Sequence, residues 1–316
     1  MDDELENFKT RINLTEYAAS QGYSYDRKES SRNSAVMRGE GGDKMIVARG
    51  EDGHWIYFST HDENDNGSII DFVLNRQRCS FGWVRQELRR WLGTDIRPSP
   101  DLFIPHLEPV TKDRANALLN LAKARTLTWH RHLEEDRGIP VSVLTGKRFA
   151  GKLRVDLRGN ALFPHADKDG TCGYEVKNRC FTGFSAGGEK GLWFSAANRD
   201  DHTLVFAESG IDALSYAVLH PEPRTRYASI AGAMNPNQPE LIRSAAIHLM
   251  EGSRVIIAMD NDPPGHKLAE QLESVISETN RNDLEIVRHL PEGRDQDWND
   301  VLRAMIGRLT DLKPSP

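Results

Sequence analysis

The stretch "RVIIAMDNDPPGHKLAEQL", residues 254–272, begins as a short apolar strand and continues as a helix after two aspartates, Asp260 and Asp262. The stretch "TLVFAESGIDALS", residues 203–215, has the same plan, with Glu208 directly after its strand. From Thr203 onward, apolar runs alternate with helical segments, which predicts an α/β fold with a parallel sheet flanked by helices. In such sheets, ligands bind where the strands end at the carboxyl edge.

The acidic residues of both motifs follow predicted strands at that edge. If the two strands are neighbours, the carboxylates of Glu208, Asp260 and Asp262 converge, and crowded carboxylates repel one another unless a cation is present. Oxygen ligands of this kind favour Mg²⁺ or Mn²⁺. A helix cap is the competing interpretation, because Asp262 precedes Pro263 and Asp212 could cap its own helix. Either motif alone fits both interpretations, but two motifs in succession favour a metal site.

Upstream of this region the sequence divides into three further parts. Residues 1–93 predict a small α+β unit, with two short helices in 4–22, alternating strands between 34 and 60, and helices over 68–77 and 80–93. Residues 94–111 are rich in proline and predict a linker. Residues 112–200 predict a basic unit that is helical to about 148 and then rich in strands. The last domain is expected over 201–316.

Charge and hydropathy limit the functional classes. A net charge of −6 over 316 residues argues against a simple basic nucleic-acid binder. A basic stretch nevertheless lies between Thr111 and Arg158, and solvated helix faces are its simplest explanation. No long apolar run or signal peptide is visible, so we expect a cytoplasmic protein with no membrane partner. The basic residues are Lys112, Arg114, Lys123, Arg125, Arg131, Arg137, Lys147, Arg148, Lys152, Arg154 and Arg158.

Three cysteines, Cys79, Cys172 and Cys180, are too few for a disulfide framework. Their spacing does not match a zinc knuckle, and His54 and His61 have no cysteine partners. We therefore expect no zinc.

The segments "FAESGIDALS" and "AMDNDPPGHKLA" resemble the Toprim domain, which bacterial DnaG-type primases, topoisomerases and several nucleases share. The resemblance implies that Glu208 acts in acid/base or metal-assisted chemistry on a phosphodiester. It also implies that Asp260 and Asp262 hold a divalent metal, and that Gly210 lets the chain turn tightly into its helix.

Segments before the Toprim motifs resemble the primase catalytic core: "HRHLEEDRGIPVSVL", "NALFPHADKDGTCGYEVKNR" and "EKGLWF". By position, Arg137, Arg179 and Lys190 match basic residues that line the primase cleft. The N-terminal segment "NGSIIDFVLNRQRCSFGWVRQEL" resembles the end of a primase zinc ribbon, without its zinc ligands. The other candidates for the site are Lys147, Arg148 and Lys267 as phosphate contacts, and Gly232, Asp297 and Asn299 as neighbours, although Asp297 is equally suited to cap a helix.

As a whole, the chain resembles short Toprim proteins of plasmids and integrative elements. The resemblance implies a primase-like nucleotidyltransferase that acts on single-stranded DNA or RNA with nucleotides, and it makes a helicase or relaxase of the same element a candidate partner. A Toprim nuclease and a catalytically inactive DNA-binding adaptor are the alternatives. A topoisomerase is disfavoured, because Tyr216 and Tyr227 are better explained as core residues than as nucleophiles.

Overall fold

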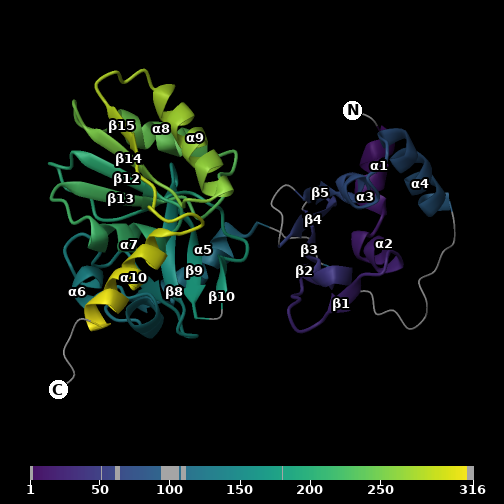
Figure 1. The fold of residues 1–316 in the computed structure, drawn as a ribbon, viewed down its shortest axis with the longest axis horizontal. Helices are drawn as coiled ribbons and strands as arrows, with labels where there is room; N and C mark the ends of the chain where they lie inside the picture. Colours follow the sequence, from purple (N-terminus) through teal and green to yellow (C-terminus); the bar gives the residue numbers. More distant parts are fainter. Residues whose placement is uncertain are drawn as a thin grey trace. The chain divides into compact units, whose positions relative to one another are not determined.

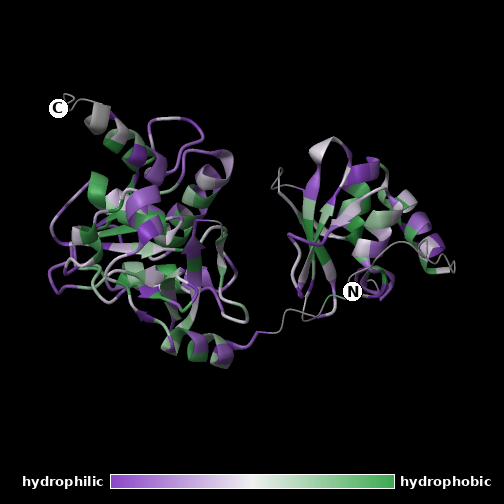
Figure 2. Ribbon diagram, turned by 90° about the horizontal axis from the view of Figure 1, so that it is seen from below, coloured by the Kyte–Doolittle hydropathy of each residue, from purple (hydrophilic) through white to green (hydrophobic). Residues whose placement is uncertain are grey.

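The computed structural model describes residues 3–50, 52–60, 65–93, 107, 112–179 and 181–311. The chain divides into two compact units, Met1–Lys112 and Asp113–Pro316 (Figure 1). Of the expected linker over 94–111, only Leu107 is among the described residues. His61 and Cys180 lie outside the described residues. In each unit, hydrophobic residues concentrate on the inner strands and the helices that face them (Figure 2).

The first unit is an α+β fold, as the alternating pattern predicted. Its five strands form one antiparallel sheet in the order β1-β2-β3-β4-β5. Helix α3 begins with a capping box, in which Ser68 and Asp71 satisfy each other's backbone amides. The elements are α1 (Asp3–Arg11), α2 (Leu14–Ser20), β1 (Ser24–Asp26), β2 (Ser34–Arg38), β3 (Lys44–Arg49), β4 (Trp55–Ser59), β5 (Asn66–Ser68), α3 (Ile69–Gln77) and α4 (Phe81–Gly93).

The second unit begins with a part whose sheet is antiparallel and has the order β10-β9-β8-β7-β6. The helical region expected over 112–148, with a break at "RGIP", is also interrupted earlier, because Arg125–Thr126 pairs with Arg154–Val155 as a sheet edge. The elements are α5 (Arg114–Ala122), β6 (Arg125–Thr126), a π-helical turn (His132–Asp136), α6 (Val141–Leu144), β7 (Arg154–Val155), β8 (Ala161–Asp167), β9 (Gly170–Asn178) and β10 (Phe181–Phe184).

The same unit continues into the predicted parallel sheet, with the order β11-β13-β12-β14-β15. Strand β12 pairs in parallel with both β13 and β14, β14 pairs in parallel with β15, and β11 is antiparallel at the edge. The elements are β11 (Trp193–Phe194), β12 (Thr203–Ala207), α7 (Gly210–Leu219), β13 (Thr225–Ser229), α8 (Gln238–Ile247), β14 (Arg254–Ala258), α9 (Pro263–Ser277), β15 (Glu285–Arg288) and α10 (Trp298–Asp311).

Helices cover both faces of this sheet, which confirms the predicted fold class. Val205 on β12 packs in one apolar cluster with residues of α7 and α10, such as Leu214 and Leu302. Leu204, the preceding residue, packs in another cluster with α8 and α9, as the alternation of side chains along a strand requires.

One apolar core joins the β-rich part to the parallel sheet. Phe163 of β8 and Trp193 of β11 belong to the same buried cluster as Val205 and Ala258. The boundary expected between residues 200 and 201 therefore lies inside one compact unit. No helix in the described part of the chain is both long and apolar enough to cross a bilayer.

Candidate active site

Glu208 and Asp260 lie at the carboxyl ends of two neighbouring strands. Strands β12 and β14 are paired in register, with Ala207 opposite Ala258, so the residues that follow them emerge at the same sheet edge. Both side chains line one cavity of about 430 Å³, and Asp212 and Asp297 line it too. The convergence expected from the two acidic motifs is therefore present for Glu208 and Asp260.

Asp262 has a different position from the one expected. It is not among the residues that line this cavity. Its Oδ1 accepts the backbone N–H of Gly265 at 2.7 Å and caps α9, which also has prolines in its first turn. The helix-cap interpretation thus describes its contacts, although its charge still acts on Asp260.

Asp212 is buried at the start of α7 without being the cap of that helix. Ser209 is the cap, and its hydroxyl accepts the N–H of Asp212 at 3.3 Å and donates to the Asp212 carboxylate at 2.5 Å. The Asp212 carboxylate therefore remains at the cavity, one helical turn after Glu208.

The carboxylates of this cavity raise one another's pKa. Burial, and then the charges of Asp212, Glu208, Asp297 and Asp262, raise the pKa of Asp260 well above its usual range. Burial and the charge of Asp297 likewise raise the pKa of Asp212. One oxygen of Asp260, Oδ1, is buried and has no hydrogen-bond partner among the described residues. A cation at this place would supply the missing partner and offset the repulsion.

The side-chain positions do not by themselves form a complete metal-binding cluster. Within the described residues, no three His, Cys, Asp or Glu side chains are arranged so that they could hold a metal ion. The contacts above give a reason, since Asp262 is engaged by its helix and Asp212 by Ser209. The donors present are nevertheless carboxylate oxygens, which suit Mg²⁺ and Mn²⁺.

Basic side chains line the same cavity. Arg137 and Lys190 are there, as the resemblance implied, and so is Lys177, which the sequence did not single out. Asn299 is fully buried and holds Arg137 in place: its Oδ1 accepts from Arg137 Nη1 at 3.2 Å, and its Nδ2 donates to the Arg137 carbonyl at 2.8 Å. Lys190 Nζ donates to the Ala233 carbonyl at 3.3 Å, and burial lowers the pKa of this lysine.

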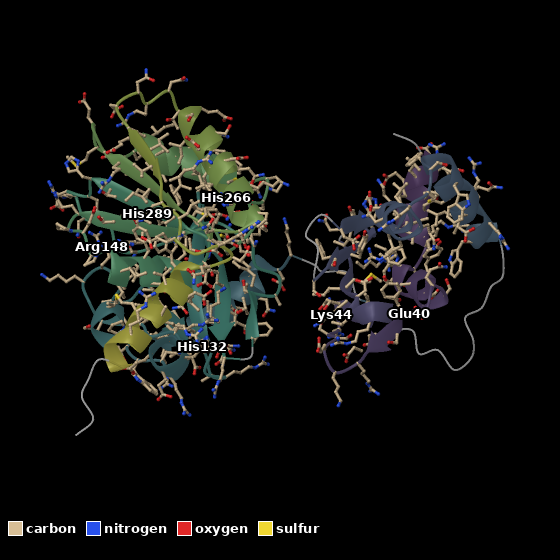
Figure 3. All side chains as sticks on the ribbon, in the orientation of Figure 1. Glu40, Lys44, His132, Arg148, His266 and His289 are labelled. Atoms are coloured by element: carbon tan, nitrogen blue, oxygen red, sulfur yellow. The ribbon has the colours of Figure 1, made fainter. Side chains whose placement is uncertain are left out.

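The remaining basic candidates lie elsewhere. Arg179 is exposed and lines a neighbouring cavity of about 420 Å³ with Trp129 and His132 (Figure 3 labels His132). Arg148 is bound to both carboxylate oxygens of Asp201, at 2.7 and 2.9 Å, which indicates a structural role. Lys147 and Lys267 are exposed, and neither lines the acidic cavity.

Two glycines shape the edge of the cavity. Gly210 begins α7, and a Cβ at this position would collide with the ring of Phe163. Glycine is therefore required here because Phe163 packs so closely, whereas the resemblance implied that glycine allows a tight turn. Gly232 has a left-handed backbone, with φ of 80°, and its N–H donates to the carbonyl of Glu208 at 3.0 Å.

Glu175 on β9 is a buried residue of this cavity that the sequence analysis missed. Its Oε1 accepts from Ser229 Oγ at 2.6 Å and lies 3.0 Å from His165 Nε2, while its Oε2 accepts the N–H of Gly210 at 3.2 Å. Burial opposes ionisation, but His165, Lys177 and Ser229 outweigh it and hold the pKa of Glu175 at about 2. The signal in the sequence was a glutamate inside an otherwise buried strand.

His165 completes this arrangement from the other side. Its Nδ1 lies 2.8 Å from the carbonyl of Gly191, so both ring nitrogens face oxygen acceptors. The ring of His165 is fully buried between these two acceptors. The pair connects β8 and β9 to Gly210 and Ser229, the residues at the ends of the strands that present the acidic site.

Comparison with known proteins agrees with this geometry. The family described as "Toprim-like" matches residues 205–302, and a "Protein of unknown function (DUF3991)" family matches residues 131–201. The uncharacterized protein pXO2-78 of Bacillus anthracis is 24% identical over 300 residues, which cover 83% of this chain and 79% of that protein.

Two solved structures are also similar. The primase fragment of the bacteriophage T7 primase-helicase protein has 14% identity and a TM-score of 0.44, covering 84% of this chain and 92% of that one. A DNA primase domain from Pseudomonas aeruginosa has 15% identity and a TM-score of 0.36, and the match covers 59% of this chain and 64% of that domain. The family match covers both acidic motifs and the parallel sheet that presents them, so residues 205–302 are a Toprim-like domain.

Proposed function

We propose that the second unit catalyses metal-dependent phosphoryl transfer on nucleic acid, as a primase-like nucleotidyltransferase that extends a strand on a single-stranded template. The observation that carries the proposal is the cavity at the carboxyl edge of the sheet. Glu208, Asp260, Asp212 and Asp297 line it together with the cations of Arg137, Lys177 and Lys190. The Toprim-like family match supports the same reading.

The acidic residues would hold Mg²⁺ or Mn²⁺, with Glu208 and Asp260 as the principal ligands and Asp212 or Asp297 beside them. Divalent ions at such a site stabilise the attacking and the leaving oxygens of a phosphodiester. The crowding that raises the pKa of Asp260 supports this assignment, because a bound cation would reverse it. Asp262 would then contribute charge and a helix cap.

The basic residues would hold the phosphates of the strand and the nucleotide. Arg137 is suited to this because Asn299 fixes its backbone and one guanidinium nitrogen. A preorganised guanidinium binds phosphate oxygens without first losing side-chain freedom. Lys190 is partly desolvated, which strengthens its attraction for an anion.

A nuclease is the second candidate, because the same carboxylates can activate water in place of a 3′ hydroxyl. A catalytically inactive adaptor is the third. We further expect the partner of the enzyme to be a helicase or relaxase encoded with it on a mobile element.

One assay separates these functions. The protein is incubated with labelled single-stranded DNA, nucleotides, and Mg²⁺ or Mn²⁺, and the product lengths are measured. A nucleotidyltransferase lengthens the labelled products, a nuclease shortens the substrate, and an adaptor changes neither. Arg199 is an exposed arginine outside the cavity, so Arg199→Ala is the matched control for variants that remove a positive charge from the cavity.

A further inference from the structure

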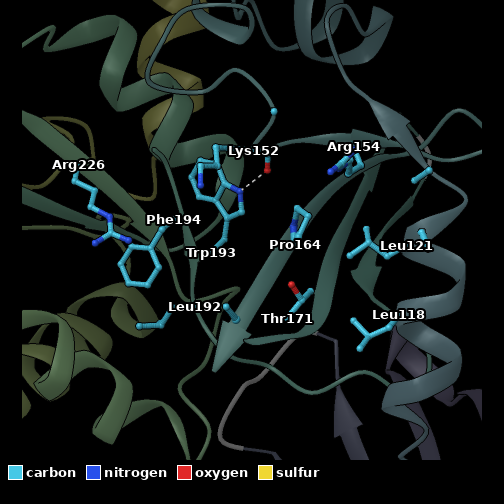
Figure 4. Close-up of a pocket in the computed structure, with 14 residues that line it drawn as sticks. Leu118, Leu121, Lys152, Arg154, Pro164, Thr171, Leu192, Trp193, Phe194 and Arg226 are labelled. Atoms are coloured by element: carbon cyan, nitrogen blue, oxygen red, sulfur yellow. Dashed lines mark hydrogen bonds between the residues drawn. The ribbon is translucent and has the colours of Figure 1, made fainter. Parts of the chain in front are cut away.

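A second cavity, of about 550 Å³, lies away from the acidic site (Figure 4). It shares none of its lining residues with the acidic cavity. Pro164 and Ala166 of β8 line it, whereas His165 between them turns to Glu175 at the acidic cavity. Because alternate side chains of a strand point to opposite sides, the two cavities lie on opposite faces of this sheet.

The charge of this second cavity is entirely positive. Lys152, Arg154 and Arg226 line it, and none of the described lining residues is an aspartate or glutamate. This contrasts with Arg114 and Arg148 of the same unit, which are bound to Asp167 and Asp201. For the three cavity cations, no ion pair is found within the described residues.

Arg226 is the most unusual of the three. Its guanidinium lies over the ring of Phe194, with 4.2 Å between its central carbon and the ring centroid. Its Nε is buried without a hydrogen-bond partner among the described residues, and burial lowers its pKa. A guanidinium stacked in this way is held flat, and although the charge of Asp201 acts on it, it forms no ion pair within the described residues, which is a suitable arrangement for an anion.

Apart from Thr171, the rest of the wall is apolar. Figure 4 shows Leu118 and Leu121 of α5 on one side and Leu192 and Phe194 on the other, with Pro164 between them. Cavities of several hundred Å³ with apolar walls and a few charged groups are typical of sites for small molecules. A ligand that matches the second cavity has an anionic end and a flat, weakly polar body.

We propose that this second cavity binds a nucleoside phosphate, with its phosphates toward Arg226 and Lys152 and its base toward Leu118 and Leu121, on the side of Arg154. The site is separate from the metal-dependent chemistry, and its occupancy does not require a divalent ion.

ATP is the probe, titrated calorimetrically into the full chain with a chelator present. We expect binding that is at least about tenfold weaker for inorganic phosphate and for adenosine, since each lacks one half of the ligand. Arg226→Ala and Arg154→Glu should each weaken ATP binding by about tenfold or more. Ala122→Trp places a bulky ring at an exposed position of the cavity wall and should have a similar effect with little cost to folding.

Arg199→Ala should bind ATP as the original protein does, and circular dichroism should show that every variant is folded. No binding of ATP in chelator, or equal binding by the folded Arg226→Ala and Arg154→Glu variants, contradicts the proposal. Loss of binding in Lys190→Ala alone would place ATP in the acidic cavity and overturn it. Displacement of ATP by a 5′-phosphorylated oligonucleotide would show that the site takes a strand end, which also overturns it.

Discussion

Asp65 in the first unit and Asp260 in the second are two carboxylates in opposite surroundings. Asp65 Oδ1 accepts from Tyr57 Oη at 2.5 Å and from Asn75 Nδ2 at 3.0 Å, and Arg76 binds Oδ2. Burial alone would raise its pKa, but these contacts outweigh burial and lower it. Asp260 instead faces other carboxylates, and its pKa is raised. The carboxylate of Asp65 has its partners within the folded unit, whereas Asp260 Oδ1 has no hydrogen-bond partner among the described residues and can accept a ligand.

The contacts of Arg76 show what a satisfied charge can do. Besides Asp65, its guanidinium forms an ion pair with Asp43 at 3.2 Å and donates to Tyr23 Oη at 2.7 Å. Tyr23, Asp43 and Asp65 each directly precede a strand, namely β1, β3 and β5 respectively. One side chain on α3 thereby joins three loops, which is the kind of cross-link that a structural metal provides in a small domain.

The largest expected effect is on catalysis. Asp260→Asn should lower metal-dependent activity by at least about 100-fold, because even residues that only support metal ligands are worth roughly 10- to 100-fold. Asp262→Asn keeps an oxygen for the α9 cap and should lose less, whereas Asp262→Ala should also cost about 1 kcal/mol of helix stability. Primer-extension rates at saturating Mg²⁺ measure the activity of these variants, and denaturant unfolding measures the stability of Asp262→Ala. Full activity of Asp260→Asn would place the metal elsewhere.

The next effect concerns the buried pair behind the site. Glu175→Gln should destabilise the second unit by about 3–5 kcal/mol, because it removes the buried carboxylate that forms an ion pair with the largely buried Lys177 and contacts the ring of His165. Combining it with His165→Gln should restore part of the loss, since neither of the two contacting side chains then keeps an unmatched partner. Denaturant unfolding measures the cycle. Strict additivity of the two losses would show that the residues do not interact.

In the first unit, Arg76→Ala should cost about 2–3 kcal/mol, less than for Glu175 because Arg76 is partly exposed. Hydrogen exchange should report the loss in residues 23–77 and should show no change in the second unit. Arg27→Ala is the exposed control.

We also predict that elemental analysis of the purified protein finds no stoichiometric zinc. Zinc whose removal unfolds the unit would contradict this prediction.

Local patterns were enough to predict much of the fold and part of the site. Apolar runs ending in Glu208 and Asp260 gave the parallel sheet and its acidic edge, because strand order and direction constrain where these residues emerge. The same patterns could not separate a cap from a ligand at Asp262, since both use a carboxylate before a helix. That choice depends on side-chain direction, which spacing does not specify.

Pairings between distant residues were beyond reach for a different reason. Arg148 meets Asp201, and Glu175 meets His165, Gly210 and Ser229, only after several strands have assembled. A basic residue in a sequence can therefore be a phosphate contact or half of a structural pair. Arg137 and Arg148 look alike in the basic stretch, yet only Arg137 lines the acidic cavity.

A smaller effect is expected for nucleic-acid binding. Lys190→Ala and Arg179→Ala should each weaken binding of single-stranded DNA by about tenfold or less, and each should reduce the salt slope by about one. Arg199→Ala should leave the slope unchanged. Fluorescence anisotropy between roughly 50 and 200 mM salt measures this. If wild-type affinity does not depend on salt, the strand is not held by its phosphates and a small phosphorylated substrate becomes the better proposal.

The smallest effect is a difference in pH dependence between the two units, measured by hydrogen exchange with a chelator present and intrinsic rates corrected. The pKa of Asp260 is raised in the folded state, so the folded state binds more protons than the unfolded state above the usual value near 4. The contribution of Asp260 to the free energy of unfolding of the second unit should therefore fall as the pH rises from about 5 to 8, by about 1 kcal/mol or more.

Asp65 has the opposite sign. Its pKa is lowered in the folded state, so its contribution is fully present above the usual value and is lost only as the pH falls through the lowered one. The contribution of Asp65 should then be constant between pH 5 and 8, the range over which the contribution of Asp260 weakens. Asp260→Asn should flatten the trend of the second unit, and so should Mg²⁺, because a bound cation removes the advantage of a proton. An identical trend in both units, or one that survives Asp260→Asn, would mean that the carboxylate cluster is not the source of the difference.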